Sequence, residues 1–253
     1  MKKNNINSYF DKKFLNSFLV LGLILIISIG ILASLLHGSS QSSKYHYIFQ
    51  SYYGPKYLPL WLIKKVSVDR SLYDLTLSNG TVDLDSDLEY DFDSKGQINL
   101  TPIGIIPEKN YSGKWTCWDR NGIVRATYNI TKGKIVGLSK EFDSDGLLQL
   151  TVQPSVNMFK RYVLVQINYY SNGDKSELIS LSPNCEYDGI HKLWYRNGQI
   201  KIHSIYSDEI LISFIRYDKD GSLNKKEYYD KKGVFIKREL YKDNKLTETE
   251  TTE

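Results

Sequence analysis

The hydrophobic positions of this chain follow two different patterns. Residues Phe14 to Leu36 form a continuous apolar run without a charged side chain or a proline. From about residue 90 onward, short stretches of alternating apolar and polar residues are separated by glycine-containing turns. The first pattern is typical of a membrane-spanning helix and the second of half-buried β-strands. We therefore expect one helix followed by an all-β body.

The apolar run is long enough to cross a membrane. Its 23 residues would extend roughly 34 Å as a helix, against a hydrocarbon core of about 30 Å. A cleaved signal peptide is the alternative, although its apolar core is usually about 7 to 15 residues long. A buried soluble helix is disfavoured, because a helix that is apolar on all sides needs a large core around it. The run is therefore interpreted as an uncleaved anchor.

The flanking lysines predict the orientation of this anchor. Four precede the run and two follow it within about 20 residues: Lys2, Lys3, Lys12 and Lys13, then Lys44 and Lys56. The positive-inside rule then places the N-terminus in the cytoplasm and the body outside, at the cell membrane. The predicted parts are a cytoplasmic stub (1–13), a transmembrane helix (14–36), an aromatic juxtamembrane linker (37–65), a β-hairpin repeat domain (66–246) and a disordered polar tail (247–253). The alternative for the aromatic segment is a first strand packed into the body.

A short phrase recurs through the body: an aromatic or acidic residue, one or two polar residues, a glycine and an alternating apolar run. Successive copies of its glycine are separated by 26, 24, 27, 25, 23 and 12 residues. Such regular spacing indicates a repeat architecture. The marker glycines are Gly96, Gly122, Gly146, Gly173, Gly198, Gly221 and Gly233.

The residues around the marker glycines predict β-hairpins. Five of these glycines follow Asn or Asp, and such pairs supply the positive φ values that a tight hairpin turn needs. Each unit should contain a strand, a tight turn, a second strand and a looser return. Because a hairpin cannot bury its apolar face alone, the units should stack side by side. The predicted fold class is an all-β repeat array of antiparallel β-hairpins, preceded by one N-terminal transmembrane α-helix.

Two phrases resemble a known repeat. Gly189–Lys201, with the sequence Trp-Tyr-Arg-Asn-Gly-Gln-Ile-Lys at its end, is similar to the MORN-variant repeat, and so is Gly113–Gly122. The resemblance covers about Tyr90 to Leu246, although Thr151–Val163 fits poorly. It implies a MORN-like open sheet. Bacterial chains of this kind are often called YwqK-type antitoxins, which implies toxin neutralisation or partner binding and no general catalytic residues.

Charge argues against nucleic acid as a partner. The formal net charge is +4, of which residues 1–43 carry +3, so the body is nearly neutral. Phosphate binding needs a concentrated basic face. The 20 tyrosines favour β structure instead, because aromatic side chains suit a pleated, half-buried surface.

Two sets of residues are candidate binding sites. An acidic strip of alternating carboxylates could dock a basic protein or a cation, or could simply be a solvated outer strand that resists edge-to-edge pairing. It consists of Asp83, Asp85, Asp87, Glu89, Asp91 and Asp93. An aromatic ladder near the turns could bind a protein or a glycan, or could fill the core between hairpins. It includes Trp115, Trp118, Tyr170, Trp194, Tyr195 and Tyr217.

No residue pattern indicates catalysis, a cofactor or a metal site. The four histidines lack ligand spacing, and Cys117 and Cys185 could form one disulfide or remain two buried or half-buried thiols. We therefore expect a membrane-anchored, non-enzymatic protein that binds a protein partner. A basic toxin is the most specific partner that the resemblance supports, which would make the chain an antitoxin or immunity protein. The alternative is a cell-envelope module that binds glycans or lipid headgroups.

Overall fold

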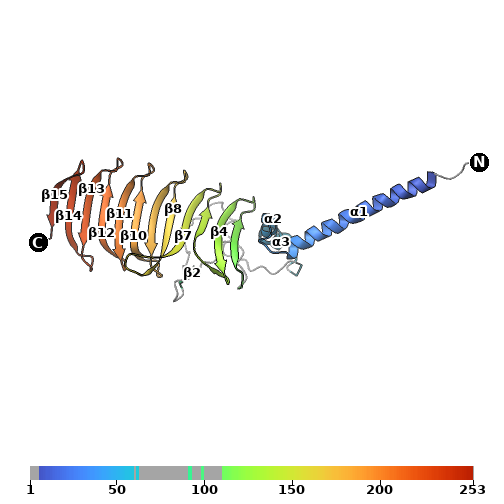
Figure 1. The fold of residues 1–253 in the computed structure, drawn as a ribbon, viewed down its shortest axis with the longest axis horizontal. Helices are drawn as coiled ribbons and strands as arrows, with labels where there is room; N and C mark the ends of the chain where they lie inside the picture. The colour runs from blue at the N-terminus through green and yellow to red at the C-terminus, as the bar shows by residue number, and fades with distance from the viewer. Residues whose placement is uncertain (1–5, 60, 63–90, 93–97, 100–109, 253) are drawn as a thin grey trace, which may run out of the picture. The chain divides into compact units, whose positions relative to one another are not determined.

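The structure, a computed structural model, describes residues 6–59, 61, 62, 91, 92, 98, 99 and 110–252. The chain divides into two compact units, Met1–Val66 and Ser67–Glu253. The described part of the first unit is helical, and that of the second is a β-sheet (Figure 1).

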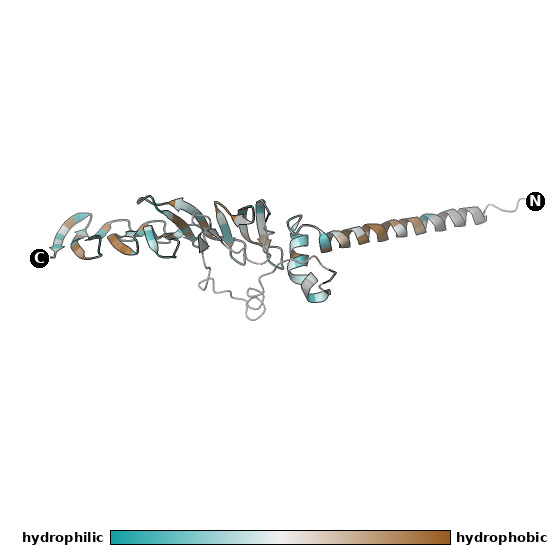
Figure 2. Ribbon diagram, turned by 90° about the horizontal axis from the view of Figure 1, so that it is seen from below, coloured by the Kyte–Doolittle hydropathy of each residue, from teal (hydrophilic) through white to brown (hydrophobic). Residues whose placement is uncertain are grey.

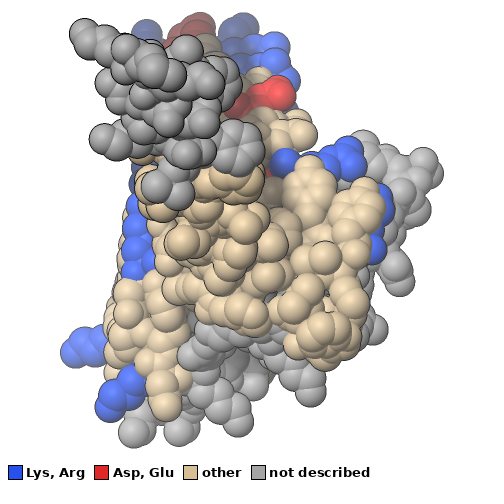
Figure 3. Space-filling model, turned by 90° about the vertical axis from the view of Figure 1, so that its right-hand side faces the viewer, with Lys and Arg blue, Asp and Glu red and all other residues tan. Residues whose placement is uncertain are grey.

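The first unit begins with the long apolar helix α1 (Ile6–His37). Its segment Asn16–His37 has a mean hydropathy of 2.9 and is long enough to cross a membrane as an anchor or to serve as a signal sequence. Its large apolar side chains from Phe18 to Leu32 are at least half exposed. The described surface in the middle of Figure 3 is almost entirely uncharged.

Three short helices follow: α2 (Lys44–Ile48), the π-helix η1 (Phe49–Tyr53) and α3 (Gly54–Tyr57). The buried Gln50 donates from Nε2 to the carbonyl oxygens of Leu35 and Gly38, both at 2.9 Å. It thereby satisfies carbonyl groups that the end of α1 would otherwise leave unpaired. The alternative prediction of a first strand in this segment is wrong, because these residues fold back as helices against the end of α1.

The second unit is one open antiparallel sheet, which confirms the predicted fold class. From β6 to β15 each strand pairs with its neighbours in the chain, as Figure 1 shows by colour. β4 pairs with β3 on one side and with β5 and β6 on the other, and β5 leads to β2 and β1. The strands are β1 (Asp91–Phe92), β2 (Ile98–Asn99), β3 (Gly113–Trp118), β4 (Val124–Thr131), β5 (Lys134–Ile135), β6 (Ser139–Phe142), β7 (Leu148–Val156), β8 (Tyr162–Tyr169), β9 (Lys175–Leu181), β10 (Tyr187–Trp194), β11 (Ile200–Ser207), β12 (Ile210–Tyr217), β13 (Leu223–Tyr229), β14 (Phe235–Lys242) and β15 (Lys245–Thr251).

The described marker glycines stand at the last position of their turns, five along one edge of the sheet and Gly233 along the other. At the β3–β4 turn, the N–H of Gly122 donates to the carbonyl of Asp119 at 3.0 Å, and the N–H of Asp119 donates to the carbonyl of Ile123 at 2.9 Å. Gly122 has a φ of 83°, whereas Asn121 before it is not among the residues with positive φ. This is a type I turn followed by a glycine bulge, so the glycine alone supplies the positive φ.

From β7 onward, the connections without a marker glycine are as tight as the glycine turns, so the predicted looser return is wrong. At the β11–β12 return both Asp208 and Glu209 have positive φ, as do Asp243 and Asn244 at the β14–β15 return. Two consecutive residues of this kind form the two-residue turn whose twist matches that of the strands. Tight turns therefore close both edges of the sheet, with one positive-φ residue in each glycine turn and two in each of these returns.

The tail is a further correction. Residues 247–253 look disordered from composition, but Lys245–Thr251 form β15, which pairs with β14. The alternation of Thr and Glu puts Glu250 opposite Arg238, and Arg238 Nη1 donates to Glu250 Oε2 at 3.1 Å. A polar strand is thus held by backbone pairing and a cross-strand ion pair rather than by burial.

Side-chain burial is concentrated in the first part of the sheet. Strand register places the buried apolar residues of β3 to β8 largely on one face, and Val152 and Leu164 pack there with Leu150 and Leu181. In β11 to β15 the only described side chains that are buried belong to Ser204 and Glu227. Apolar and polar residues mix along the strands, whereas α1 is brown over most of its described length (Figure 2). The latter part of the sheet is therefore a layer with both faces partly exposed.

Candidate interaction site at the β7–β8 turn

The turn between β7 and β8 carries apolar side chains at its tip. Asn157 opens the turn, and its Oδ1 accepts the N–H groups of Phe159 at 2.9 Å and Arg161 at 3.1 Å. The N–H of Lys160 donates to the Asn157 carbonyl at 3.0 Å, and Lys160 takes the positive φ that glycine takes elsewhere. These bonds fix the backbone, so the apolar side chains at the tip are presented in a defined geometry.

Five large side chains around this turn are exposed, although their chemistry favours burial. Val156 and Tyr162 are direct cross-strand partners. Leu164 pairs with Leu181 and Leu181 with Tyr187, so the register puts Tyr187 on the same face as Val156 and Tyr162. The exposed set, called here the apolar turn patch, is Val156 (54% exposed), Met158 (61%), Phe159 (38%), Tyr162 (59%) and Tyr187 (39%).

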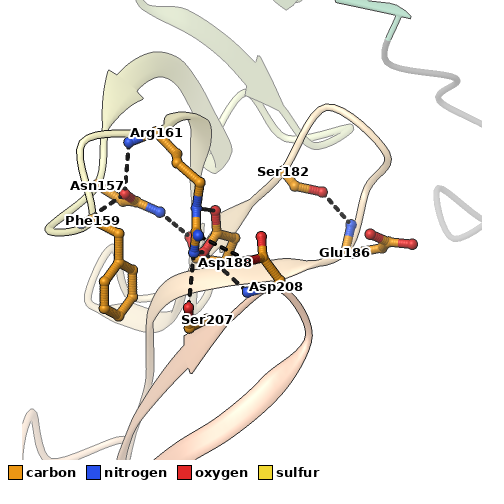
Figure 4. Close-up of polar contacts among 8 residues, drawn as sticks. All are labelled: Asn157, Phe159, Arg161, Ser182, Glu186, Asp188, Ser207 and Asp208. Atoms are coloured by element: carbon orange, nitrogen blue, oxygen red, sulfur yellow. Dashed lines mark hydrogen bonds and ion pairs between the residues drawn. The ribbon is translucent and has the colours of Figure 1, made fainter. Parts of the chain in front are cut away.

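Arg161 ties the turn to two later hairpins (Figure 4). Its Nε donates to Asp188 Oδ2 at 2.7 Å, and its Nη2 also donates to the second oxygen of Asp188. Its Nη1 donates to Asp208 Oδ2 at 2.9 Å, and Nη2 to Ser207 Oγ at 3.0 Å. The planar guanidinium suits this two-pronged contact with a carboxylate. One side chain thus connects β8 with β10 and with the end of β11.

A bulge brings Asp188 to this position. Tyr187 is opposite Leu181 and His191 is opposite Ile179, so β10 uses two more residues than β9 over this interval. Within the bulge Gly189 has a φ of 116°, and a Cβ there would lie 3.1 Å from Ser180 Cβ and 3.3 Å from Asn157 Cβ. Glycine is therefore needed for the close approach of β10 to the β7–β8 turn.

The ion pair of Arg161 and Asp188 is partly buried. The Asp188 side chain is 2% exposed and that of Arg161 is 36% exposed. The hydrogen bond to Asp188 raises the pKa of Arg161, so the guanidinium stays charged. The Arg161 guanidinium also lies 5.0 Å from the centre of the Phe159 ring. Removing one member of such a buried pair leaves the charge of the other uncompensated. Because this pair ties the β7–β8 turn to β10, Arg161 is a positioning residue for the apolar turn patch.

Tyr187 is held from the other side by stacking. Its ring lies 4.9 Å from that of Tyr206 and 5.3 Å from that of His191. His191 Nε2 is 2.9 Å from Glu177 Oε1, and this hydrogen bond is the main cause that lowers the pKa of Glu177. The patch is thus supported by aromatic contacts as well as by Arg161.

The acidic strip predicted from the sequence falls outside the described residues, apart from the backbone of Asp91. Asp83, Asp85, Asp87, Glu89 and Asp93 are not described. Asp91 belongs to β1, where it pairs with Asn99. The docking role of the strip stays a prediction.

The predicted aromatic ladder is spread over two environments. Trp115 is buried on β3, where its ring meets that of Tyr111 edge to face at 4.9 Å. The other five members are partly exposed at or beside turns: Trp118, Tyr170, Trp194, Tyr195 and Tyr217. Among these, hydroxyl groups link successive repeats: Tyr170 donates to the Trp194 carbonyl at 2.6 Å, and Tyr195 donates to the Tyr217 carbonyl at 3.0 Å. These bonds give the ladder a structural role between repeats, and its binding role stays a prediction.

The two cysteines are not bridged. Cys117 is buried on β3, and Cys185 is exposed at the end of the β9–β10 turn. Within the described part of the chain, no group of three or more His, Cys, Asp or Glu side chains is placed to hold a metal ion.

Sequence reasoning missed the apolar turn patch and Arg161. The available signal was the poor fit of Thr151–Val163 to the repeat phrase, since Met158 and Phe159 replace the polar residues of a regular turn. The partners Asp188 and Asp208 lie 27 and 47 residues further along the chain. That pairing depends on the bulge in β10, which no local pattern predicts.

The comparisons with known proteins concern the neighbouring hairpin. Residues 187–208 match the MORN repeat variant. This match covers β10 and β11 and supports the resemblance at Gly189–Lys201. It includes Asp188 and Asp208, so a regular repeat supplies the partners of Arg161, which comes from the irregular one.

Two further comparisons add no family. No protein with a curated description matches the chain. Among solved structures, accessory secretory protein 1, 2 and 3 of Streptococcus pneumoniae matches with 24% identity and a TM-score of 0.22, over 41% of this chain and 18% of that chain. The match thus spans less than a fifth of that chain's length, and at this TM-score it carries no argument.

Proposed function

We propose that this chain is a membrane-anchored, non-enzymatic repeat protein that binds a protein partner through the apolar turn patch. Its N-terminus lies in the cytoplasm, its sheet lies outside, and α1 is retained as the anchor. Neutralisation of a toxin is the more specific role that the resemblance to antitoxins favours. A MORN-variant match and an N-terminal apolar helix are consistent with the general role.

The exposure of the patch carries this proposal. Met158 and Tyr162 are 61% and 59% exposed, although burying such side chains would stabilise a protein by about 1.5–3 kcal/mol each. Arg161 and Asn157 hold their turn in one geometry before any partner arrives. Preorganisation of apolar and aromatic side chains lowers the entropic cost of association. A stiff, exposed apolar turn is therefore better explained by protein binding than by folding alone.

Site-specific photo-crosslinking tests this function. The full chain would carry p-benzoylphenylalanine in place of Tyr162, in native membranes, with the same residue in place of Ile236 as the control. Ile236 is also exposed, at 46%, but lies in β14. We expect one protein adduct at position 162 and none at position 236. No adduct at 162, or the same adducts at both positions, would contradict the proposal.

A further inference from the structure

Residues 38–59, which include α2, η1 and α3, fold against the end of α1 and are called here the helical cap. Besides the two bonds that Gln50 donates there, His46 Nε2 lies 2.9 Å from the hydroxyl of Ser34, which belongs to α1. The other ring nitrogen of His46 lies 2.8 Å from Ser43 Oγ. These bonds hold the cap beside the last turn of the apolar segment.

The helical cap exposes aromatic side chains next to lysines. Tyr45 and Tyr57 are 66% and 67% exposed, and Trp61, just after the cap, is 83% exposed. Lys44 Nζ lies 5.4 Å from the centre of the Tyr45 ring, and Lys56 Nζ lies 5.1 Å from the centre of the Tyr57 ring. The sequence of the cap contains no Asp or Glu. The cap therefore presents two cations, each against an exposed tyrosine ring, and has a net positive charge.

We infer that the helical cap lies in the headgroup layer of the membrane that α1 spans, where Lys44 and Lys56 bind the phosphates of anionic lipids. This inference rests on the proposed retention of α1 as the anchor. Tyr and Trp side chains favour the membrane interface, because their rings are apolar and their polar ends stay in water. Lysines beside a membrane span are attracted to anionic headgroups. A bilayer is favoured over a protein as the occupant, because the bonds of Ser34 and Gln50 hold the cap where the apolar segment ends.

Quenching of Trp61 by lipids with brominated acyl chains tests this inference in the full chain, reconstituted into vesicles. The other three tryptophans belong to the sheet, so the difference between each chain and its Trp61→Phe variant isolates the emission of Trp61. Brominated phosphatidylglycerol should quench Trp61 roughly twice as strongly as the same mole fraction of brominated phosphatidylcholine, because the lysines gather anionic lipid. Lys44→Gln with Lys56→Gln should make the two lipids quench equally. The matched control, Lys231→Gln with Lys232→Gln at two exposed positions of the β13–β14 turn, should keep the preference.

Three other results would overturn the inference, and they differ in what they leave standing. Equal quenching by the two lipids in the parent chain, or a preference kept without Lys44 and Lys56, would overturn the binding of anionic lipid by these lysines. Quenching of Trp61 by acrylamide and by neither lipid, in a chain that stays with the vesicles after an alkaline wash, would overturn the placement of the cap and leave the anchor standing. The surface of the cap would then be open to a protein partner. Release of the chain by the wash would overturn the retained anchor as well.

Discussion

The first and last parts of the sheet have the same hairpin geometry but different sources of stability. In β3 to β8, apolar side chains such as Val152, Val163 and Leu164 are buried to 3% exposure or less. In β11 to β15, cross-strand ion pairs take the place of such a core. The comparison teaches that one repeat geometry can be stabilised by burial in one region and by side-chain pairing in another.

In β11 to β15, the ion pairs between strands gather around Glu227. Lys225 Nζ lies 3.0 Å and Arg238 Nε 2.7 Å from its Oε1, and Arg238 continues to Glu250. Burial alone would raise the pKa of Glu227, but the hydrogen bonds from Lys225 and Arg238 outweigh it and lower that pKa. Lys237 lies 4.6 Å from the centre of the Tyr228 ring on the same pair of strands. In this part of the sheet, long side chains therefore cover one another instead of packing under a second layer of helices or strands.

Truncation of the core should have the largest effect. Leu164→Ala should lower the free energy of unfolding by about 2–4 kcal/mol, because the residue is 1% exposed and a cavity would remain. Leu240→Ala, at a half-buried position of β14, should cost about 1 kcal/mol. Urea titration of the full chain in detergent micelles, followed by tryptophan fluorescence, measures both. Equal losses would contradict the contrast between the two regions.

Loss of Arg161 should come next, because it joins the two regions. Arg161→Ala should cost about 2–3 kcal/mol, since Asp188 stays buried without its partner. Asp188→Ala should lower the stability much less in the Arg161→Ala background than in the parent chain. A double-mutant cycle from the same urea titrations measures this difference. Additive losses would show that the two side chains do not depend on each other.

Glu141 provides a pH-dependent test within the buried region. Its Oε2 is buried without a hydrogen-bond partner, and burial raises the pKa of Glu141 to about 7 while Arg125 lowers it. The folded state therefore holds a proton that the unfolded chain releases above its ordinary pKa of 4.5, so stability should fall as pH rises from about 4.5 to 7. Glu141→Gln should remove this fall and gain about 1–2 kcal/mol at pH 8. The same slope in both proteins would contradict the assignment.

The smallest effect on stability is expected from a substitution in β11 to β15, where ion pairs join the strands. Arg238→Ala should lower the stability only slightly at low salt, because its side chain is 37% exposed and water screens the pair. The loss should shrink in 1 M salt, where the screening length is about 3 Å. Thermal unfolding at the two salt concentrations measures the difference. A loss as large as that of Leu164→Ala would mean that the ion pairs act as a core.

The sequence predicts the repeat and the apolar helix because both are local patterns. Glycine spacing and alternating residues depend on a few neighbouring positions, and the apolar run depends only on its own composition. The prediction of a disordered tail is wrong because its Thr and Glu residues favour disorder by composition, whereas β14 supplies a pairing edge. The Arg161 network could not be predicted, since it needs a bulge in β10 and partners on two later hairpins.

We propose that the exposed apolar side chains of the β7–β8 turn bind a protein partner. The most direct measurement compares two doubly substituted full-length chains by affinity purification from native membranes and quantitative mass spectrometry. One carries Val156→Ser with Tyr162→Ser, and the other carries Val234→Ser with Ile236→Ser, which are also exposed apolar positions. We expect one protein that the parent chain captures to be lost from the first variant and kept by the second. Retention of the same proteins by both variants would contradict the claim.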